Sequence, residues 1–226
     1  MKIGILQTGH LPDELSATQG VLSDLFERML GGHGFVFETW AVVDDQFPET
    51  VEDAHAWVIT GSKHGAYEDL PWIRRLEDFI RAAYAHEKRI VGICFGHQVI
   101  AKALGGTVEK WDGGWSVGRQ SYSWQGEEVH LNAWHQDQVT KRPADATVLA
   151  ANSFCENAAL VYGDTILTVQ AHPEFDASLI EGLADHRSDS VPPALVTEAR
   201  AALDKDVDNG IVALKLARFL KSGKTA

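Results

Sequence analysis

The segment RIVGICFGHQVIAKAL, residues 89–104, predicts a buried strand that turns directly into a helix. Its first half is a short apolar run, as a strand inside a parallel sheet requires, and its second half repeats apolar residues at helical spacing. Cys94 stands at the junction, with Gly92 and Gly96 two residues to either side. This is the spacing of a nucleophile elbow, a tight turn that lifts a side chain off a sheet. The segment therefore predicts both a parallel α/β sheet and a candidate nucleophile.

Strands and helices alternate around this segment. Apolar runs predict strands at 2–7, 34–42, 56–62 and 89–94, and amphipathic patterns predict helices at 16–30, 70–88 and 96–106. Shorter alternating segments between 107 and 150 predict antiparallel or mixed strands, followed by two strand candidates within 157–175 and helices at 194–206 and 209–223. We expect a single domain, residues 1–226. The alternation predicts an α/β three-layer sandwich with a mostly parallel, doubly wound sheet and a small additional antiparallel sheet.

Composition excludes several classes of protein. The chain has 226 residues, of which 45% are hydrophobic, enough for a sizeable core. A net charge of −12 argues against a nucleic-acid partner, because phosphates would be repelled. Two cysteines without a disulfide pattern indicate a reducing compartment. The N-terminus lacks the apolar core of a signal peptide and no stretch is long enough to span a bilayer, so we expect a cytoplasmic protein with no membrane partner.

The position of Cys94 favours chemistry. Ligands of a doubly wound sheet gather at the carboxyl ends of its strands, and Cys94 follows one such end. The N-terminus of the following helix favours a thiolate. The competing interpretation is a small, inert, buried side chain, which is the commoner fate of a lone cysteine. We assign that structural role to Cys155, which has no elbow around it.

Two further segments provide partners for a nucleophile. In VQAHPEF, residues 169–175, His172 and Glu174 are two apart, so on extended chain they point to the same side and the carboxylate can orient the imidazole. In ITGSKHG, residues 59–65, a strand ends in small residues whose amides can face an oxyanion, together with the amide of Phe95. Taken singly, each segment also fits an ordinary strand end; the combination favours covalent catalysis.

These segments resemble a known family. GICFGHQ (92–98), AHPEF (171–175), ITGS (59–62) and WHQDQ (134–138) look like those of the class I glutamine amidotransferases, in particular free-standing members similar to the amidotransferase part of GMP synthase and also γ-glutamyl peptidases. The resemblance covers most of the chain and implies their flavodoxin-like fold. We expect no cofactor and no metal: His130 and His135, five residues apart, face opposite sides of a strand and lack a third metal ligand nearby.

The resemblance also implies roles for individual residues. Cys94 would attack a γ-carboxamide, His172 would act as general base and then acid, and Glu174 would orient the imidazole. The amide of Phe95, with that of either Gly61 or Ser62, would form the oxyanion hole. The residues implied to hold the amino-acid end of the substrate are Gln98, His135, Gln136 and Asp137.

Three functions remain open at this stage. A γ-glutamyl hydrolase would act alone on a small-molecule substrate, glutamine or a γ-glutamyl amide or peptide. A glutaminase subunit would deliver ammonia to a separate synthase subunit, for which the 226 residues have no room. A non-catalytic redox sensor would use only the activated thiol. The loop that carries His64, Tyr67, Glu68 and Asp69 lies beside the expected oxyanion turn and is a candidate for setting the choice.

Overall fold

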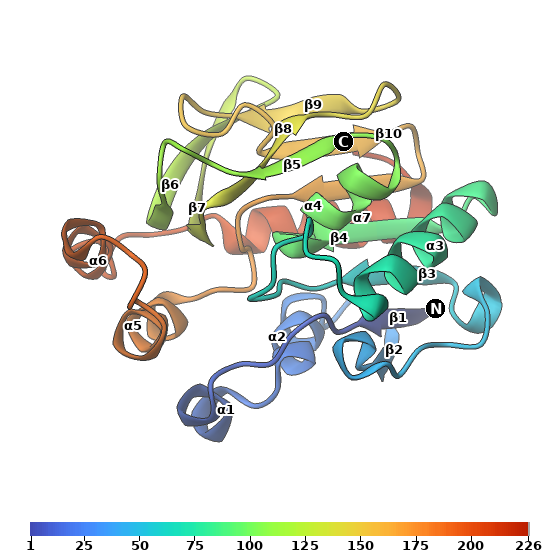
Figure 1. The fold of residues 1–226 in the computed structure, drawn as a ribbon, viewed down its shortest axis with the longest axis horizontal. Coiled ribbons are helices and arrows are strands. Elements are labelled where there is room, and N and C mark those ends of the chain that lie inside the picture. The colour runs from blue at the N-terminus through green and yellow to red at the C-terminus, as the bar shows by residue number, and fades with distance from the viewer. Residues whose placement is uncertain (226) are drawn as a thin grey trace.

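The computed structural model describes residues 1–225 and contains a nine-stranded sheet and a separate two-stranded sheet (Figure 1). The strands are β1 (Lys2–Leu6), β2 (Val36–Trp40), β3 (Ala56–Ile59), β4 (Arg89–Ile93), β5 (Thr107–Lys110), β6 (Ser116–Trp124), β7 (Glu127–His135), β8 (Asp137–Lys141), β9 (Thr147–Ala151), β10 (Ala159–Tyr162) and β11 (Ile166–Val169). The helices are α1 (Asp13–Gln19), α2 (Leu22–Met29), α3 (Pro71–Ala85), α4 (Phe95–Ala103), α5 (Ala177–His186), α6 (Pro193–Arg200) and α7 (Asn209–Ser222), with 3₁₀ turns η1 (Val42–Asp44) and η2 (Val51–Asp53).

The large sheet has a parallel half and an antiparallel half. Its order is β2-β1-β3-β4-β11-β10-β9-β6-β7, and the first five strands run parallel to one another. From β11 onward each strand is antiparallel to the next. The carboxyl ends of β3, β4 and β11 therefore meet at one edge of the sheet. The predicted α/β fold with a mostly parallel sheet and a small antiparallel sheet, which is the β5–β8 pair, is confirmed.

Helices cover both faces of the parallel half. Along β3, Trp57 and Ile59 belong to the apolar cluster under α3 and α4, while Val58 belongs to the cluster under α2 and α7. This alternation is the two-residue period of a strand that is buried on both sides. In Figure 1, α3 and α4 lie in front of the sheet and α7 lies behind it. On the antiparallel half, the β5–β8 pair adds to the first cluster and α6 packs against β6.

The helices depart most from the sequence prediction in three places. The helix predicted at 16–30 is two helices, α1 and α2, because Gly20 has a φ of +81° that no helix accommodates. The helix predicted at 194–206 ends at Arg200. Helix α5 was not predicted; its first turn is capped by the Asp176 carboxylate, which accepts a hydrogen bond from the Leu179 amide at 2.8 Å.

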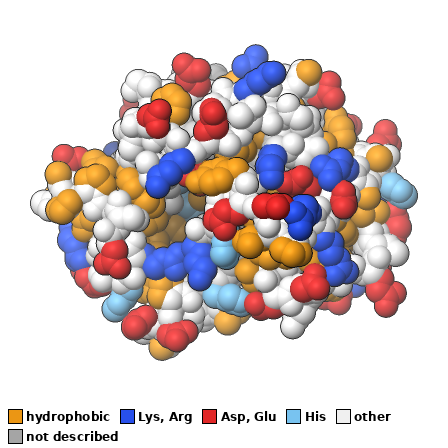
Figure 2. Space-filling view, viewed as in Figure 1, with side chains coloured by type: hydrophobic (Ala, Val, Ile, Leu, Met, Phe, Trp, Pro, Cys, Tyr) orange, Lys and Arg blue, Asp and Glu red, His pale blue; other side chains and the backbone are white. Residues whose placement is uncertain are grey.

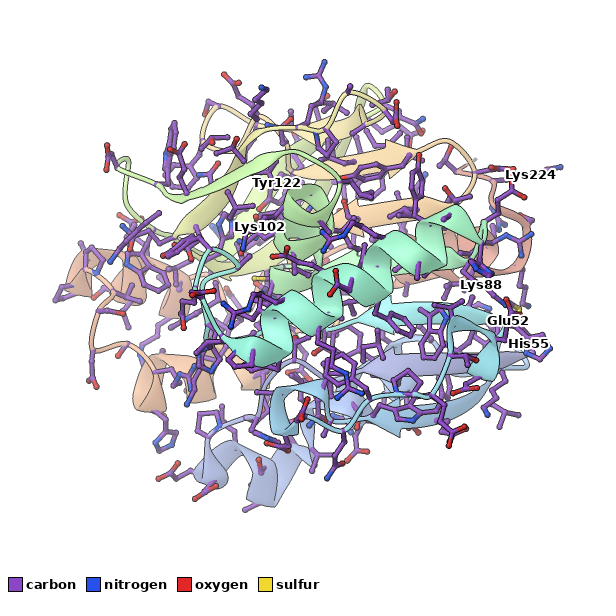
Figure 3. All side chains as sticks on the ribbon, turned by 45° about the vertical axis from the view of Figure 1, so that its right-hand side comes forward. Glu52, His55, Lys88, Lys102, Tyr122 and Lys224 are labelled. Carbon is purple, nitrogen blue, oxygen red and sulfur yellow. The ribbon has the colours of Figure 1, made fainter. Side chains whose placement is uncertain are left out.

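At the amino end of β4, opposite the edge that carries Cys94, Lys88 forms an ion pair with Glu52 at 2.6 Å (Figure 3). The Glu52 side chain is 62% exposed, so this pair adds little to stability. Among residues 1–225, no helix is long and apolar enough to cross a membrane.

Helix α4 packs directly against the strands that precede it. A Cβ added to Gly96 would lie 2.3 Å from the carbonyl oxygen of Ile59, and one added to Gly92 would lie 2.7 Å from the carbonyl oxygen of Gly96. The Gly96 amide instead donates to the Thr60 carbonyl at 3.1 Å. Because backbone fills the space on both sides, only glycine fits at these two positions.

We predict that Gly96→Ala lowers the free energy of unfolding by about 3 kcal/mol, since the new methyl group must displace backbone rather than a flexible side chain. Urea unfolding followed by circular dichroism measures this change. Gly210→Ala is the matched control: it lies in α7 with open space around its Cα, and we expect it to raise stability by about 0.5–1 kcal/mol. Equal midpoints for the two variants would contradict the packing argument.

Candidate active site

Cys94 occupies a one-residue turn between β4 and α4. Its backbone has φ 52° and ψ −101°, a region that non-glycine residues seldom adopt. The Cys94 amide donates to the carbonyl of Val169 on β11 at 2.8 Å, which fixes the turn against the neighbouring strand. The strained turn places Cys94 at the carboxyl edge of the sheet, at the N-terminus of α4, as the elbow motif predicts.

His172 and Glu174 follow β11 and reach the same edge. The His172 amide donates to the Asn132 carbonyl of β7 at 2.8 Å, so the segment is anchored to the antiparallel half. The His172 Nδ1 lies 2.7 Å from Glu174 Oε1, and the Glu174 side chain has no exposed surface. The carboxylate thus orients the ring and leaves Nε2 available to accept or donate a proton.

The ring of His172 is also held by the residue that follows this pair. Phe175 stacks on it, with ring centroids 3.8 Å apart and planes 4° from parallel. The Phe175 carbonyl accepts hydrogen bonds from the carboxamides of Asn132 at 2.9 Å and Asn209 at 2.8 Å. These contacts come from β7 and from the first residue of α7, so distant segments of the chain fix the imidazole.

The charges around His172 favour its protonated form. Burial alone would lower the pKa of His172, but the charges of Glu174 and Cys94 outweigh burial and raise it. An imidazolium next to a thiol stabilises the thiolate, which is the nucleophilic form of cysteine. The three side chains therefore form an arrangement suited to attack on a carbonyl.

Gly61 lies against both His172 and Cys94. A Cβ added to it would lie 3.2 Å from Cε1 of His172 and 3.8 Å from Cβ of Cys94. Its carbonyl is turned the other way and accepts a hydrogen bond from the Thr8 hydroxyl at 2.8 Å. Within residues 1–225, the amides of Gly61, Ser62 and Phe95 donate to no other group, so all three are free to bind a ligand.

Two carboxamide side chains, those of Gln170 and Gln98, connect Cys94 to the backbone of Asp137. Gln170 Nε2 lies 3.6 Å from the Cys94 sulfur, and Gln170 Oε1 accepts from Gln98 Nε2 at 3.1 Å. Gln98 Nε2 also donates to the Asp137 carbonyl at 2.9 Å. The nitrogen of Gln98 is therefore fully engaged, whereas its oxygen accepts no hydrogen bond within residues 1–225.

A cavity of about 310 Å³ adjoins Cys94, a size suited to a small-molecule ligand. Gln98, His135, Gln136 and Asp137 all line it, so the structure brings the four predicted substrate-binding residues together. His64, Tyr67 and Glu68 of the loop after β3 line its opposite side, whereas Asp69 pairs with Arg74 outside it. The Tyr67 hydroxyl donates to Asp137 Oδ1 at 3.3 Å and so joins the two walls.

The loop after β3 is tied to helix α4. Lys102 of α4, labelled in Figure 3, donates to the Ala66 carbonyl at 2.9 Å and pairs with Glu77 of α3 at 2.8 Å. Burial raises the pKa of Tyr67 to about 12, with a further contribution from Asp137, so the hydroxyl remains a donor at neutral pH. Burial also lowers the pKa of His135 to about 3, assisted by the charge of His172, which keeps this second histidine neutral.

A second, smaller cavity of about 80 Å³ meets the first at Cys94. Ser62, Trp134 and Arg187 line both cavities. The smaller one extends between the segment after β1 and helix α5, where its lining is largely apolar. Figure 2 shows this face of the molecule, hollowed between α5–α6 and the body of the fold, with Lys and Arg side chains around the hollow.

Sequence reasoning missed several residues of this site: Asn132, Gln170, Asn209 and Arg187. Asn132, Asn209 and Arg187 belong to no catalytic motif and reach the site through tertiary structure, whereas Gln170 stands within VQAHPEF, residues 169–175. Gln170 lies two residues before His172, just as Glu174 lies two residues after it, so on extended chain all three side chains point to the same side. This spacing was the one signal in the sequence that could have identified a missed residue. Cys155 is buried away from the two cavities, in the core of the antiparallel half. Within residues 1–225, no group of three His, Cys, Asp or Glu side chains could hold a metal ion.

Comparisons with known proteins point to one family and to one fold. The family model described as glutamine amidotransferase class-I matches residues 41–182. Gamma-glutamyl peptidase 4 of Arabidopsis thaliana is 34% identical over 184 residues, covering 74% of this chain and 73% of the relative. A relative from Sulfolobus acidocaldarius, named as one subunit of a glutamine-hydrolysing GMP synthase, is 29% identical over 189 residues, covering 77% and 89%. The fold matches a glutamine amidotransferase structure from Methylobacillus flagellatus with a TM-score of 0.74 at 21% identity, covering 97% and 91%.

We predict that Glu174→Gln shifts the alkaline limb of the activity profile to lower pH and reduces kcat at least tenfold. The neutral amide no longer raises the pKa of His172, so the imidazolium is lost earlier as pH rises. A raised pKa stabilises the fold below the unfolded value and the gain is lost as pH rises through the folded value, so the variant's loss of melting temperature should be larger at pH 6 than at pH 10. An unshifted limb would contradict this role of the carboxylate.

We predict that Gln170→Leu slows alkylation of Cys94 by iodoacetamide several-fold, because the sulfur loses a donor that stabilises its anionic form. Mass spectrometry of the labelled peptide gives the rate. Gln138→Leu is the control: its buried carboxamide donates to the Phe154 carbonyl instead, and we expect the native rate. Equal rates in the two variants would show that the contact at 3.6 Å has no influence on the thiol.

Proposed function

The chain belongs to the class I glutamine amidotransferase family and is a hydrolase acting on C–N bonds, and on this premise we propose that it cleaves γ-glutamyl amide bonds through a thioester on Cys94. The observation that carries the proposal is the convergence of Cys94, His172 and Glu174 at one edge of the sheet. A redox sensor needs only a reactive thiol, whereas this site also has an oriented imidazole and free amides beside it.

In the proposed reaction, the Cys94 thiolate attacks the γ-carbonyl carbon, and the C=O electron pair moves to oxygen. Collapse of this intermediate breaks the C–N bond as His172 gives its proton to the leaving amine, which departs neutral. Neutral His172 then removes a proton from water, the hydroxide attacks the thioester, and the thiolate leaves. Glutamate and the amine are the products, and Cys94 and His172 return to their starting states.

We assign the oxyanion hole to the amides of Phe95 and Ser62. A trans peptide directs its N–H opposite to its carbonyl, and the Gly61 carbonyl points to the Thr8 hydroxyl. The Ser62 amide therefore points away from Thr8, and Ser62 lines both cavities at Cys94. This argument favours Ser62 over Gly61, the two alternatives that the sequence left open.

The larger cavity is the proposed site for the α-amino and α-carboxyl groups of the glutamyl moiety. Gln98, His135, Gln136 and Asp137 form one wall. Because the Gln98 nitrogen is engaged, we assign its oxygen to the substrate ammonium. Asp137, whose pKa burial raises, also faces this cavity. A neutral His135 supplies polarity without repelling that ammonium.

A second function is favoured by one observation. The Sulfolobus relative is named as part of a GMP synthase, so an ammonia-delivering subunit that works with a separate synthase is the alternative. The two functions differ in what leaves: the alternative requires glutamine as substrate and activation by a partner, whereas a self-sufficient hydrolase accepts larger leaving amines.

We predict that the purified protein, alone, releases glutamate from at least one γ-glutamyl peptide or amide, and that Cys94→Ser lowers kcat at least a thousandfold with native circular dichroism. An enzyme-coupled glutamate assay on L-glutamine and a panel of γ-glutamyl peptides measures this. Cys155→Ser, the same substitution at the other buried cysteine, should retain turnover. Turnover by Cys94→Ser would overturn the mechanism. If the wild-type protein released no glutamate from any compound of the panel, the role of a synthase subunit would be favoured.

A further inference from the structure

The two cavities at Cys94 differ in chemistry. The larger one contains both signs of charge, with Lys63 and Lys110 facing Glu68 and Asp137. Such a mixture suits a group that carries an ammonium and a carboxylate together, as a glutamyl head does. The smaller one has a different lining: its polar side chains are those of His10, Ser62, Cys94, His172, Glu174 and Arg187, and most of its other residues are apolar.

The smaller cavity exceeds what ammonia requires. Its volume of about 80 Å³ is roughly five times the space that one water molecule needs. The apolar residues around it are Leu11, Pro12, Leu22, Trp134, Phe175 and Leu183. An apolar recess next to a nucleophile gains free energy only when an apolar group fills it. The recess therefore fits a leaving group with carbon atoms rather than free ammonia.

Arg187 is the basic residue where the two cavities meet. It follows the last turn of α5 and is half-buried. Within residues 1–225, its guanidinium makes no hydrogen bond or ion pair. By contrast, Arg200 on the adjacent α6 pairs with Asp185 and Glu181. In a chain with net charge −12, a guanidinium beside the nucleophile without an acidic partner indicates a site for an anionic ligand group.

We propose that the smaller cavity is the leaving-group subsite and that Arg187 binds a carboxylate on the departing amine, an inference that rests on the proposed function. The substrate class is then γ-glutamyl amino acids and peptides whose residue after the scissile bond has a small apolar side chain and a free carboxylate. Arginine binds a carboxylate through two parallel hydrogen bonds, which fixes orientation as well as affinity. The apolar walls contact the side chain, and Arg187 sets the direction in which the amine leaves.

The test compares two substrates with the same acyl group, γ-glutamyl-alanine and γ-glutamyl-alaninamide, which differ in the carboxylate alone. We expect wild-type kcat/KM to be at least tenfold higher for the acid. Arg187→Met should lower this ratio at least tenfold, mainly by raising KM for the acid. Arg187→Lys, which keeps the charge without the planar fork, should lie between the two.

Arg75→Met is the matched control. Arg75 lies on α3, away from both cavities, and pairs with Asp45, so we expect the wild-type ratio. A wild-type enzyme that hydrolyses both substrates equally, or an Arg187→Met variant with an unchanged ratio, would overturn the subsite while leaving the proposed function intact. A wild-type enzyme that hydrolyses neither substrate nor any other γ-glutamyl compound would overturn the proposed function and the subsite with it.

Discussion

The close approach of Gly96 to the Ile59 carbonyl determines where Cys94 stands. Because α4 packs directly against β3, the chain has a single residue in which to change from strand to helix, and Cys94 adopts a left-handed φ of 52° to do so. Val169 holds the Cys94 amide from the other side. Since β3, β4 and β11 are parallel neighbours, the turn after β3 and the segment after β11 reach the same edge. The site thus follows from sheet topology once the elbow is in place.

A buried charge is tolerated at this edge because its surroundings compensate for it. The Glu174 carboxylate has no exposed surface, and within the described chain its Oε2 has no hydrogen-bond partner. A lone buried carboxylate would cost several kcal/mol, and the pair is acceptable only because His172 is protonated beside it. Asn132 and Asn209 hold the backbone that carries both side chains. The protonation of His172 that offsets the free-energy cost of burying Glu174 is therefore the same protonation that the proposed reaction uses.

The sequence was informative where physical constraints are local. The spacing of Gly92, Cys94 and Gly96 predicts the elbow, and apolar runs predict the parallel strands, because these features depend on neighbouring residues. The break at Gly20 and helix α5 were not predicted. A glycine inside an amphipathic pattern is compatible with a continuous helix, and the backbone conformation that ends α1 is decided by packing. Residues such as Asn209 reach the site through folding alone, so no local pattern marks them.

Helix α5, the element that the sequence did not predict, also forms part of the wall of the smaller cavity. It supplies Leu183 to the smaller cavity and is followed directly by Arg187, while Asp176 caps its other end only two residues after Glu174. The segment that orients the imidazole is therefore continuous with the wall that faces the leaving amine. In the proposed reaction, the residues that orient the imidazole and those that face the leaving amine therefore belong to one continuous segment, residues 174–187, whereas Cys94 stands on another.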